Sequence, residues 1–465
     1  MHKIRSFDVF DTLLSRRYID SRVIWEELGQ RYGIDSFAAN RITADTGSRS
    51  LIQIYEAMEL AGQIPSHLTI DELYEAELEC EKKYAFPIKE NIDKVRNGDI
   101  FVSDMYMSGK DVLNLTRSIG MDKQVTIYQS NGDKSSGAFW DRMKGKLDLE
   151  YHLGDNAHSD VSMPLSRGFN AVHYPNGLTG REEFFINNGL LHLGLLLREV
   201  RLRNYEETYA PLFAIANQDN LSWLFIACEI IFRKYPGKEI VFLGRDCQLM
   251  HKIYNAFFSV KSYYLPFSRE VAMKQPEEAV AYLKHYTTNN SIFVDISSTG
   301  RTWEIICEHH PFNVEAMVHS DTYWYSQDKP TLPETFSYIH RNSIIGSTSI
   351  ILEVFNCGDH GKLKYIDIVE GVPIGRFGET ELPKEAIEVI HKPVNDAVVL
   401  KNHYSAISNE LMQVGLEELE AISATLMVNI SNIPKSSINL LNPNNNMYIM
   451  DEFDRKEAEY LDIVS

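Results

Sequence analysis

Apolar and polar residues follow two different periods along this chain. Short runs rich in β-branched and aromatic residues predict strands at 4–10, 100–103, 124–128, 151–154 and 170–174, and apolar positions spaced by three and four predict helices over 22–95. Further helices are predicted between the later strands, at 109–119 and 137–146. Strands and helices that alternate at this spacing favour a parallel sheet. We therefore predict an α/β domain over residues 1–180 that contains a long helical stretch.

A second alternation of the same kind follows the first. Its predicted strands are 239–243, 262–266, 291–295 and 316–319, with helices at 190–203 and 221–234. Proline and turn-forming residues in 174–181 place a boundary near residue 180. We predict a second α/β domain at 181–370 and a mostly helical region at 371–465, which includes a helical stretch at 383–428 and an Asn-rich stretch at 442–446.

Composition narrows the classes of function. The 465 residues are 44% hydrophobic and 24% charged, which is typical of globular proteins. A net charge of −19 opposes general binding to nucleic acid or to an anionic membrane, whereas local pockets for small phosphorylated molecules remain compatible with it. The apolar stretch 221–232 contains Glu229 and is shorter than the ~20 residues of a membrane span. Without a signal-peptide pattern at the start, we expect a cytoplasmic protein.

Cysteine usage excludes two further classes of site. The five cysteines are widely spaced and include no Cys-x-x-Cys pair, so neither a disulfide framework nor a zinc site is predicted. We expect free thiols in the core.

Side chains that could take part in catalysis or bind a metal ion follow the predicted strands of the first domain. Asp8 ends the first strand, Ser103 ends the next, Lys134 lies where a loop enters a helix, and Asp155 and Asp160 follow a later strand. Open parallel sheets bind ligands at these strand ends. A carboxylate there can attack phosphorus or bind Mg²⁺. Each residue alone also fits a structural role, such as a helix cap or turn former.

Their order along the chain resembles that of the haloacid dehalogenase-like (HAD) hydrolase superfamily, over about residues 3–175. The resemblance implies a Rossmann-like core in which Asp8 is the nucleophile, Ser103 binds the substrate and Lys134 balances charge. It also implies Mg²⁺ as the cofactor, held by Asp8, the backbone carbonyl of Phe10, Asp155 and Asp160. The helical stretch at about 16–97 would be the cap that closes over the site and selects the substrate.

One position departs from the phosphatases of this superfamily. They carry an acid–base aspartate two positions after the nucleophile, and here that residue is Phe10. Asp11 lies one position further on. Two roles stay open for Asp11, proton transfer and support of the loop. Phe10 fits a dehalogenase- or phosphonatase-like arrangement, a slow phosphatase, or a binding site without turnover.

A second group of polar residues follows the strand predicted at 291–295. Asp295 is followed by the hydroxyl-rich turn Ser298, Thr299, Gly300, Arg301 and Thr302. Backbone amides of such a turn can bind a terminal phosphate, and the carboxylate can accept hydrogen bonds from sugar hydroxyls. A strand, a turn and an N-capping Ser or Thr explain the same pattern without a ligand.

This turn is similar to the phosphoribosyl-pyrophosphate loop of type I phosphoribosyltransferases, although Val294 replaces the first acid of that pattern. The resemblance implies that the upstream Gly-Arg-Asp, with Arg245 and Asp246, binds the pyrophosphate side. Together with Ser268-Arg269, the two halves resemble bacterial predicted hydrolases found with genes for surface-polysaccharide synthesis.

Three functions follow as hypotheses. The first is a Mg²⁺-dependent HAD-like hydrolase, a phosphatase, that acts on a phosphorylated small molecule such as a sugar phosphate or nucleotide. The second is a catalytically impaired ligand-binding or regulatory protein. The third is phosphoribosyltransferase-like activity in the second domain, with a nucleotide or ribose-phosphate ligand. The sequence leaves the identity of any protein partner open.

Overall fold

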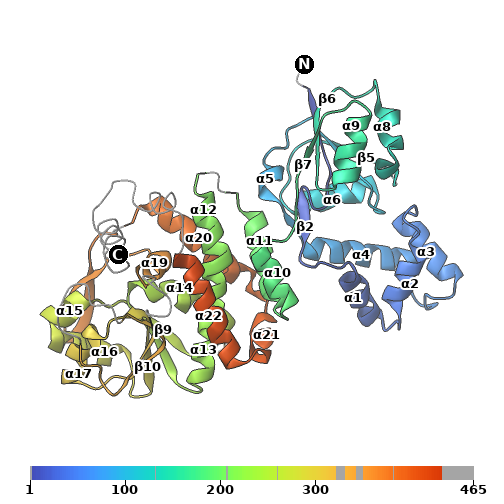
Figure 1. Cartoon of the computed structure of the whole chain (residues 1–465). Coiled ribbons are helices and arrows are strands. Elements are labelled where there is room, and N and C mark those ends of the chain that lie inside the picture. Colours follow the sequence, from blue (N-terminus) through green and yellow to red (C-terminus); the bar gives the residue numbers. More distant parts are fainter. Residues whose placement is uncertain are drawn as a thin grey trace, which may run out of the picture. The chain divides into compact units, whose positions relative to one another are not determined.

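The structure, a computed structural model, describes residues 3–130, 132–205, 208–258, 260–320, 330–341, 349–380 and 382–431 (Figure 1). The chain divides into two compact units, Met1–Thr179 with Leu202–Tyr205, and Gly180–Arg201 with Glu206–Ser465. Each unit contains one five-stranded parallel sheet, so the predicted α/β fold class is confirmed. The Asn-rich stretch at 442–446 and the residues after it lie outside the described part of the chain.

The first unit is built on the sheet β5-β4-β1-β6-β7. Its strands are β1 (Ile4–Phe7), β4 (Ile100–Ser103), β5 (Thr126–Gln129), β6 (Leu149–Gly154) and β7 (Ala171–His173). Alternate residues of β4 enter different apolar clusters, Phe101 one and Ile100 with Val102 another. Both faces of the sheet are therefore covered, as parallel sheets require. The helices of this core are α5 (Lys89–Ile92), α6 (Gly109–Ser118), α7 (Asp133–Ser136), α8 (Ala138–Met143) and α9 (Met163–Ser166).

Four helices are inserted between β1 and β4, and this insert is called the cap below (Figure 1). Its helices are α1 (Arg22–Tyr32), α2 (Phe37–Ala44), α3 (Leu51–Leu60) and α4 (Ile70–Tyr84). Two short antiparallel strands, β2 (Leu14–Arg16) and β3 (Ala85–Pro87), pair where the chain enters and leaves the cap. The expectation of helix without strands over 22–95 is therefore wrong at β3, because three residues are too few to show a strand period.

The second unit is built on the sheet β12-β11-β10-β8-β9. Its strands are β8 (Glu239–Leu243), β9 (Ser262–Leu265), β10 (Ser291–Ser298), β11 (Val314–His319) and β12 (Phe336–Arg341), and a hairpin of β13 (Leu363–Val369) and β14 (Val372–Phe377) follows. The helices preceding this hairpin are α10 (Gly180–Asn187), α11 (Leu191–Arg203), α12 (Ala210–Ile215), α13 (Leu221–Lys234), α14 (Gln248–Phe257), α15 (Arg269–Lys274), α16 (Pro276–Tyr286), α17 (Arg301–His309) and α19 (Ser349–Asn356).

The described residues of the C-terminal region that follow β14 are mostly helical, as predicted. Helices α20 (Lys384–Leu400), α21 (Ile407–Gln413) and α22 (Leu416–Ser431) follow the hairpin. Their apolar residues join the same cluster as those of β8, β10 and α13, so these helices form part of the second core.

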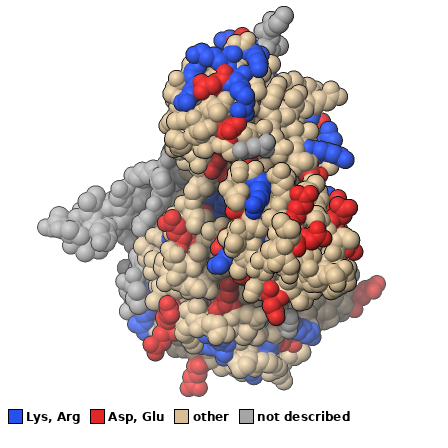
Figure 2. Space-filling model, turned by 90° about the vertical axis from the view of Figure 1, so that its right-hand side faces the viewer, with Lys and Arg blue, Asp and Glu red and all other residues tan. Residues whose placement is uncertain are grey.

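Three general predictions can be compared with the structure. All five cysteines are free, and four of them are buried. Within the described residues, no helix is long and apolar enough to cross a membrane. On the face shown in Figure 2, basic side chains gather around a few acidic ones at the top of the view, and acidic and basic side chains are interspersed below.

Candidate functional site

The first candidate site lies where the strand order of the first sheet reverses. From β1 the chain adds β4 and β5 on one side and then β6 and β7 on the other. Ligands of open parallel sheets bind beyond the carboxyl ends of the strands at such a reversal. Asp8 directly follows β1, and Asp155 directly follows β6, the two strands that adjoin the reversal.

Three carboxylates meet at this point. Oxygen atoms of Asp8, Asp155 and Asp160 all lie within 4.8 Å of one another, an arrangement that could hold a metal ion. Asp160 lies on a π-helical turn, Ala157–Ser162, an irregularity often found at functional sites. Gly154 allows this approach, because a Cβ at that position would lie 2.4 Å from the Cβ of Asp160.

Lys134 joins two of the carboxylates. Its Nζ lies 2.5 Å from Asp8 Oδ1 and 2.7 Å from Asp160 Oδ1, and the Lys134 residue is 3% exposed. Burial lowers the pKa of this ammonium, but the charges of Asp8 and Asp160 outweigh burial and raise it overall. Lys134 is therefore a fixed positive charge beside Asp8.

The same surroundings shift the pKa values of the three carboxyl groups in different directions. Burial raises the pKa of Asp8 to about 7, and burial with the charges of Asp11 and Asp160 raises that of Asp155 to about 6. Burial also raises the pKa of Asp160, but a hydrogen bond from His152 and the charge of Lys134 lower it overall to about 2. One ammonium thus faces three carboxylates.

This donor set fits a hard divalent cation. Carboxylate oxygens are the ligands that Mg²⁺ prefers, and a bound cation favours the ionised form of carboxyl groups that burial would otherwise keep protonated. Asp155 is also positioned by the loop after β1, since its backbone N–H donates to Thr12 Oγ1 at 3.1 Å.

A pocket of about 390 Å³ opens over these groups. Its lining comes entirely from the core of the unit: Asp8, Asp104, Lys134, Ser135, Asp155, Asn156, His158, Ser159 and Asp160. Four of the residues predicted for this site therefore lie at one pocket.

The other predicted residues of this site lie beside the pocket rather than in its lining. Ser103 is 1% exposed and its Oγ accepts from Met105 N at 3.3 Å, whereas the next residue, Asp104, reaches the pocket. The Phe10 ring lies 4.2 Å from the guanidinium carbon of Arg16. Asp11 has a φ of 55° and accepts from Ser15 Oγ at 2.6 Å. These contacts tie Asp11 to its own loop.

Two residues that support the first site are not among the residues predicted for it. Asp104 accepts from Gly132 N at 3.1 Å and from Ser130 Oγ, and so orders the loop that leads to Lys134. His152 is fully buried, where its Nε2 lies 3.2 Å from Asp160 Oδ1 and its Nδ1 lies 2.8 Å from Ser6 Oγ. The Ser-Asp pair after β4 was visible as a signal for Asp104, and the position of His152 close to Asp155 favours a loop or supporting role over metal ligation, because Mg²⁺ prefers oxygen ligands.

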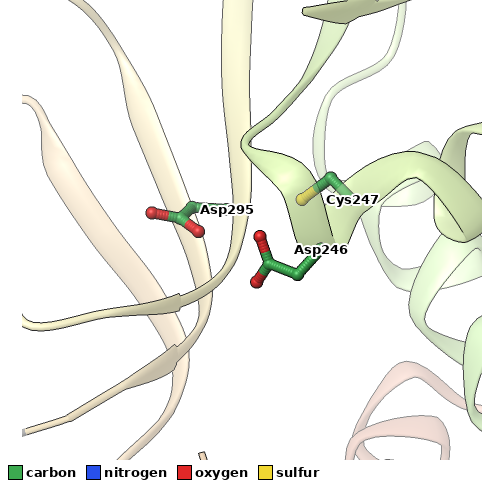
Figure 3. A group of neighbouring side chains, drawn as sticks. All are labelled: Asp246, Cys247 and Asp295. Carbon is green, nitrogen blue, oxygen red and sulfur yellow. The ribbon is translucent and has the colours of Figure 1, made fainter. Parts of the chain in front are cut away.

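The second candidate site occupies the equivalent place in the second sheet. Here the strand order reverses between β8 and β10. Asp246 and Cys247 follow β8, and Asp295 lies on β10; ligand atoms of the three lie within 4.8 Å of one another. Figure 3 shows the two carboxylates facing each other across the gap between these segments.

Further charged groups surround this pair. Burial raises the pKa of Asp246 to about 6, and burial with the charges of Asp246 and Glu353 raises that of Asp295. Glu353 lies on α19 and is not among the residues predicted for this site. The positive charges of Arg245 and Arg269 partly offset the effect of burial on the pKa of the Glu353 carboxyl.

The predicted hydroxyl-rich turn directly follows Asp295's strand. Thr299 Oγ1 accepts from Arg269 Nη2 at 3.3 Å, and Gly300 N donates to Ser298 Oγ at 3.3 Å. Gly300 has a φ of 82°, and α17 starts at Arg301 and includes Thr302. Val294 is fully buried with the apolar side chains of β10. One hydroxyl group of the turn therefore hydrogen-bonds within the turn, and another binds Arg269.

Neither protein-family models nor curated proteins match this chain.

Proposed function

We propose that the first unit is a Mg²⁺-dependent hydrolase of a phosphorylated small molecule, with Asp8 as the nucleophile. The observation that carries this proposal is the meeting of Asp8, Lys134, Asp155 and Asp160 at one strand-order reversal, beneath a pocket. The order of these residues resembles that of HAD-like hydrolases, which supports the same assignment.

Each residue has a defined part in the reaction. A carboxylate oxygen of Asp8 attacks phosphorus, and the bond from phosphorus to the leaving-group oxygen breaks. Phe10 has no proton to give, so the leaving group takes its proton from water. Water then attacks the aspartyl phosphate, which releases phosphate and restores Asp8. Lys134 stabilises negative charge on the transferred group throughout.

The acidic groups define where the cofactor belongs. Asp8, Asp155 and Asp160 would hold Mg²⁺, which supplies positive charge against the phosphoryl oxygens. His152 keeps Asp160 in position, and Thr12 keeps Asp155 in position. These contacts orient the carboxylates before any substrate binds.

Phosphate release from a panel of phosphorylated sugars and nucleotides tests the proposal. We expect Mg²⁺-dependent turnover by the full chain that is lost in Asp8→Asn. Asp148→Asn is the matched control, because it removes the same charge from an exposed position before β6 and should retain activity. Turnover that is equal in Asp8→Asn and the wild type would contradict the role of Asp8.

Phe10 favours the second hypothesis, a site that binds without turnover. Phosphate binding measured by calorimetry, in a chain that hydrolyses none of the panel, would support this alternative. Absence of phosphate binding would exclude it together with the hydrolase.

The second site supports another candidate function, binding of a phosphorylated ribose or nucleotide. The specific observation is that Asp246, Asp295 and the Arg269–Thr299 contact lie at the reversal of the second sheet. The carboxylates would accept from ribose hydroxyls, and Arg269 would attract phosphate. Calorimetry with phosphoribosyl pyrophosphate and nucleotides tests binding, and release of pyrophosphate tests transfer. Binding that is unchanged in Asp295→Asn would contradict this assignment.

A further inference from the structure

Asp104 is a carboxylate of the first pocket that lies outside the group able to hold a metal ion. It directly follows β4, the strand that pairs in parallel with β1, so it leaves the sheet at the same edge as Asp8. The residue is half-buried and lines the pocket. The pocket therefore contains one carboxylate that neither the nucleophile nor the metal position uses.

The surrounding chain engages one oxygen of Asp104 and leaves the other available. Oδ1 accepts from Gly132 N at 3.1 Å and from the Ser130 hydroxyl, both in the segment that leads to Lys134. Within the described part of the chain, Oδ2 takes no hydrogen bond. Two donors on Oδ1 fix the orientation of the carboxylate, as the orienting group of a catalytic base does, and Oδ2 can accept a proton.

The reaction proposed for this site needs a proton acceptor in its second step. The water that attacks the aspartyl phosphate must lose a proton, and Phe10 has no group that can take it. Lys134 already carries its proton, because the charges of neighbouring carboxylates outweigh burial and raise its pKa. Carboxylates that hold a divalent cation share their oxygens with that cation. Asp104 belongs to neither group.

His158 also lines the pocket and is the competing proton acceptor. Its Nε2 lies 3.0 Å from the carbonyl oxygen of Ser135, which can only accept, so Nε2 carries the hydrogen and Nδ1 remains. The residue is exposed, and within the described residues one hydrogen bond holds its ring. Asp104 is less exposed and is held by two donors, so its orientation toward an attacking water is better fixed.

We propose that Asp104 is the general base of the first site. The water oxygen forms a bond to phosphorus, one proton of that water passes to Asp104 Oδ2, and the bond from phosphorus to the Asp8 oxygen breaks with its electron pair kept by Asp8. Asp104 then releases the proton to solvent. This inference rests on the proposed function of the first site, and it makes Asp104 a catalytic residue because its carboxylate touches the attacking water.

Transient kinetics separate this step from formation of the aspartyl phosphate. The probe is p-nitrophenyl phosphate with excess Mg²⁺, because its leaving group departs without a proton and reports the first step. Asp104→Asn keeps an oxygen for Gly132 N and the Ser130 hydroxyl but removes the base. We expect a stoichiometric burst of nitrophenolate, then a steady rate roughly a hundredfold below that of the wild type. Mass spectrometry after an acid quench should find the phosphate on Asp8.

Asp148→Asn is the matched control, because it removes the same charge from an exposed position and should behave as the wild type. An Asp104→Asn chain with the wild-type steady rate overturns the proposal. Equal slowing of burst and steady rate also overturns it, since a structural defect would affect both steps. Phosphate that accumulates in His158→Gln but not in Asp104→Asn assigns the base to His158 instead. A wild type that neither releases nitrophenolate nor becomes phosphorylated overturns the proposed function, and this inference with it.

A second variant replaces the missing base from solution. Asp104→Ala leaves space for a small carboxylate, so added formate should accelerate loss of phosphate from Asp8 in proportion to its concentration. The same formate should leave the wild-type rate unchanged, because its base is already in place. A rate of phosphate loss in Asp104→Ala that does not depend on formate would overturn the role of Asp104 as a base.

Discussion

Replacing Lys134 with methionine tests the electrostatics of the first site without any substrate. The Lys134, Asp8 and Asp160 side chains are 4%, 10% and 1% exposed, so solvent screens their charges weakly. Methionine keeps much of the length of lysine and removes its charge. The variant therefore leaves buried carboxylates without their shared cation.

The expected cost follows from the remaining contacts. Removal of one partner from a buried ion pair typically destabilises a protein by about 3–5 kcal/mol. Asp160 keeps His152 Nε2 at 3.2 Å and Asn156 N at 3.2 Å, whereas the side-chain bond to the Asp8 carboxylate comes from Lys134. Most of the cost therefore falls on Asp8. Asp8→Asn in the Lys134→Met chain should recover about 2 kcal/mol, as a double-mutant cycle would show.

Hydrogen exchange is the suitable assay, because the chain contains two compact units and one overall unfolding transition would not report on the first unit alone. Protection of β1 and β6 amides, measured with a chelator present, reports the free energy of opening the first unit. Lys144→Met is the matched control at an exposed lysine and should change that free energy by at most about 0.5 kcal/mol. Wild-type protection in Lys134→Met, or no recovery in the double variant, would refute the reasoning.

Three further predictions concern other parts of the chain. Gly154→Ala should lower divalent-cation affinity by at least roughly tenfold in calorimetry, because its Cβ would displace Asp160; unchanged affinity would contradict this. Gly300→Ala should reduce protection of the second unit by about 1–3 kcal/mol more than Gly237→Ala, since both have positive φ but only a Cβ at Gly300 meets a side chain, at 2.2 Å. Burial lowers the pKa of His340 to about 4 from 6.5, so the unfolded chain takes up a proton first as pH falls, and stability is lost between these values. Replacing it in His340→Gln should remove an acid-induced loss on the order of 3 kcal/mol, seen as flatter urea midpoints against pH.

Strand ends explain why much of the first site was predictable. A buried apolar strand that stops at a carboxylate is visible in the sequence, and Asp8 and Asp155 were found in this way. Asp104 was missed in favour of Ser103, because which of two neighbours faces the pocket depends on how the chain turns after β4. Only the structure shows that Ser103 is enclosed and that Asp104 reaches the pocket.

The second unit shows where a local pattern is insufficient. Asp246 and Asp295 lie after and within predicted strands, but Glu353 belongs to a helix that the sequence reading did not identify. The strands of the hairpin were also missed, because Tyr365 and Ile368 are exposed apolar residues that obscure the alternation of a half-buried strand. Tertiary packing, rather than local preference, determines these features.

Phe10 and Val294, the two positions that differ from the patterns this sequence resembles, affect chemistry more than ligand geometry. The Phe10 ring packs beside the Arg16 guanidinium, which is paired with Glu81, and none of these three residues holds the carboxylates of the first site. Val294 points into the apolar core, on the opposite side of β10 from Asp295. Each replacement thus removes a group that could move a proton or bind a hydroxyl, and leaves the surrounding site intact. Ligand binding should therefore persist at both sites even where turnover is slow, and binding is the more sensitive first measurement.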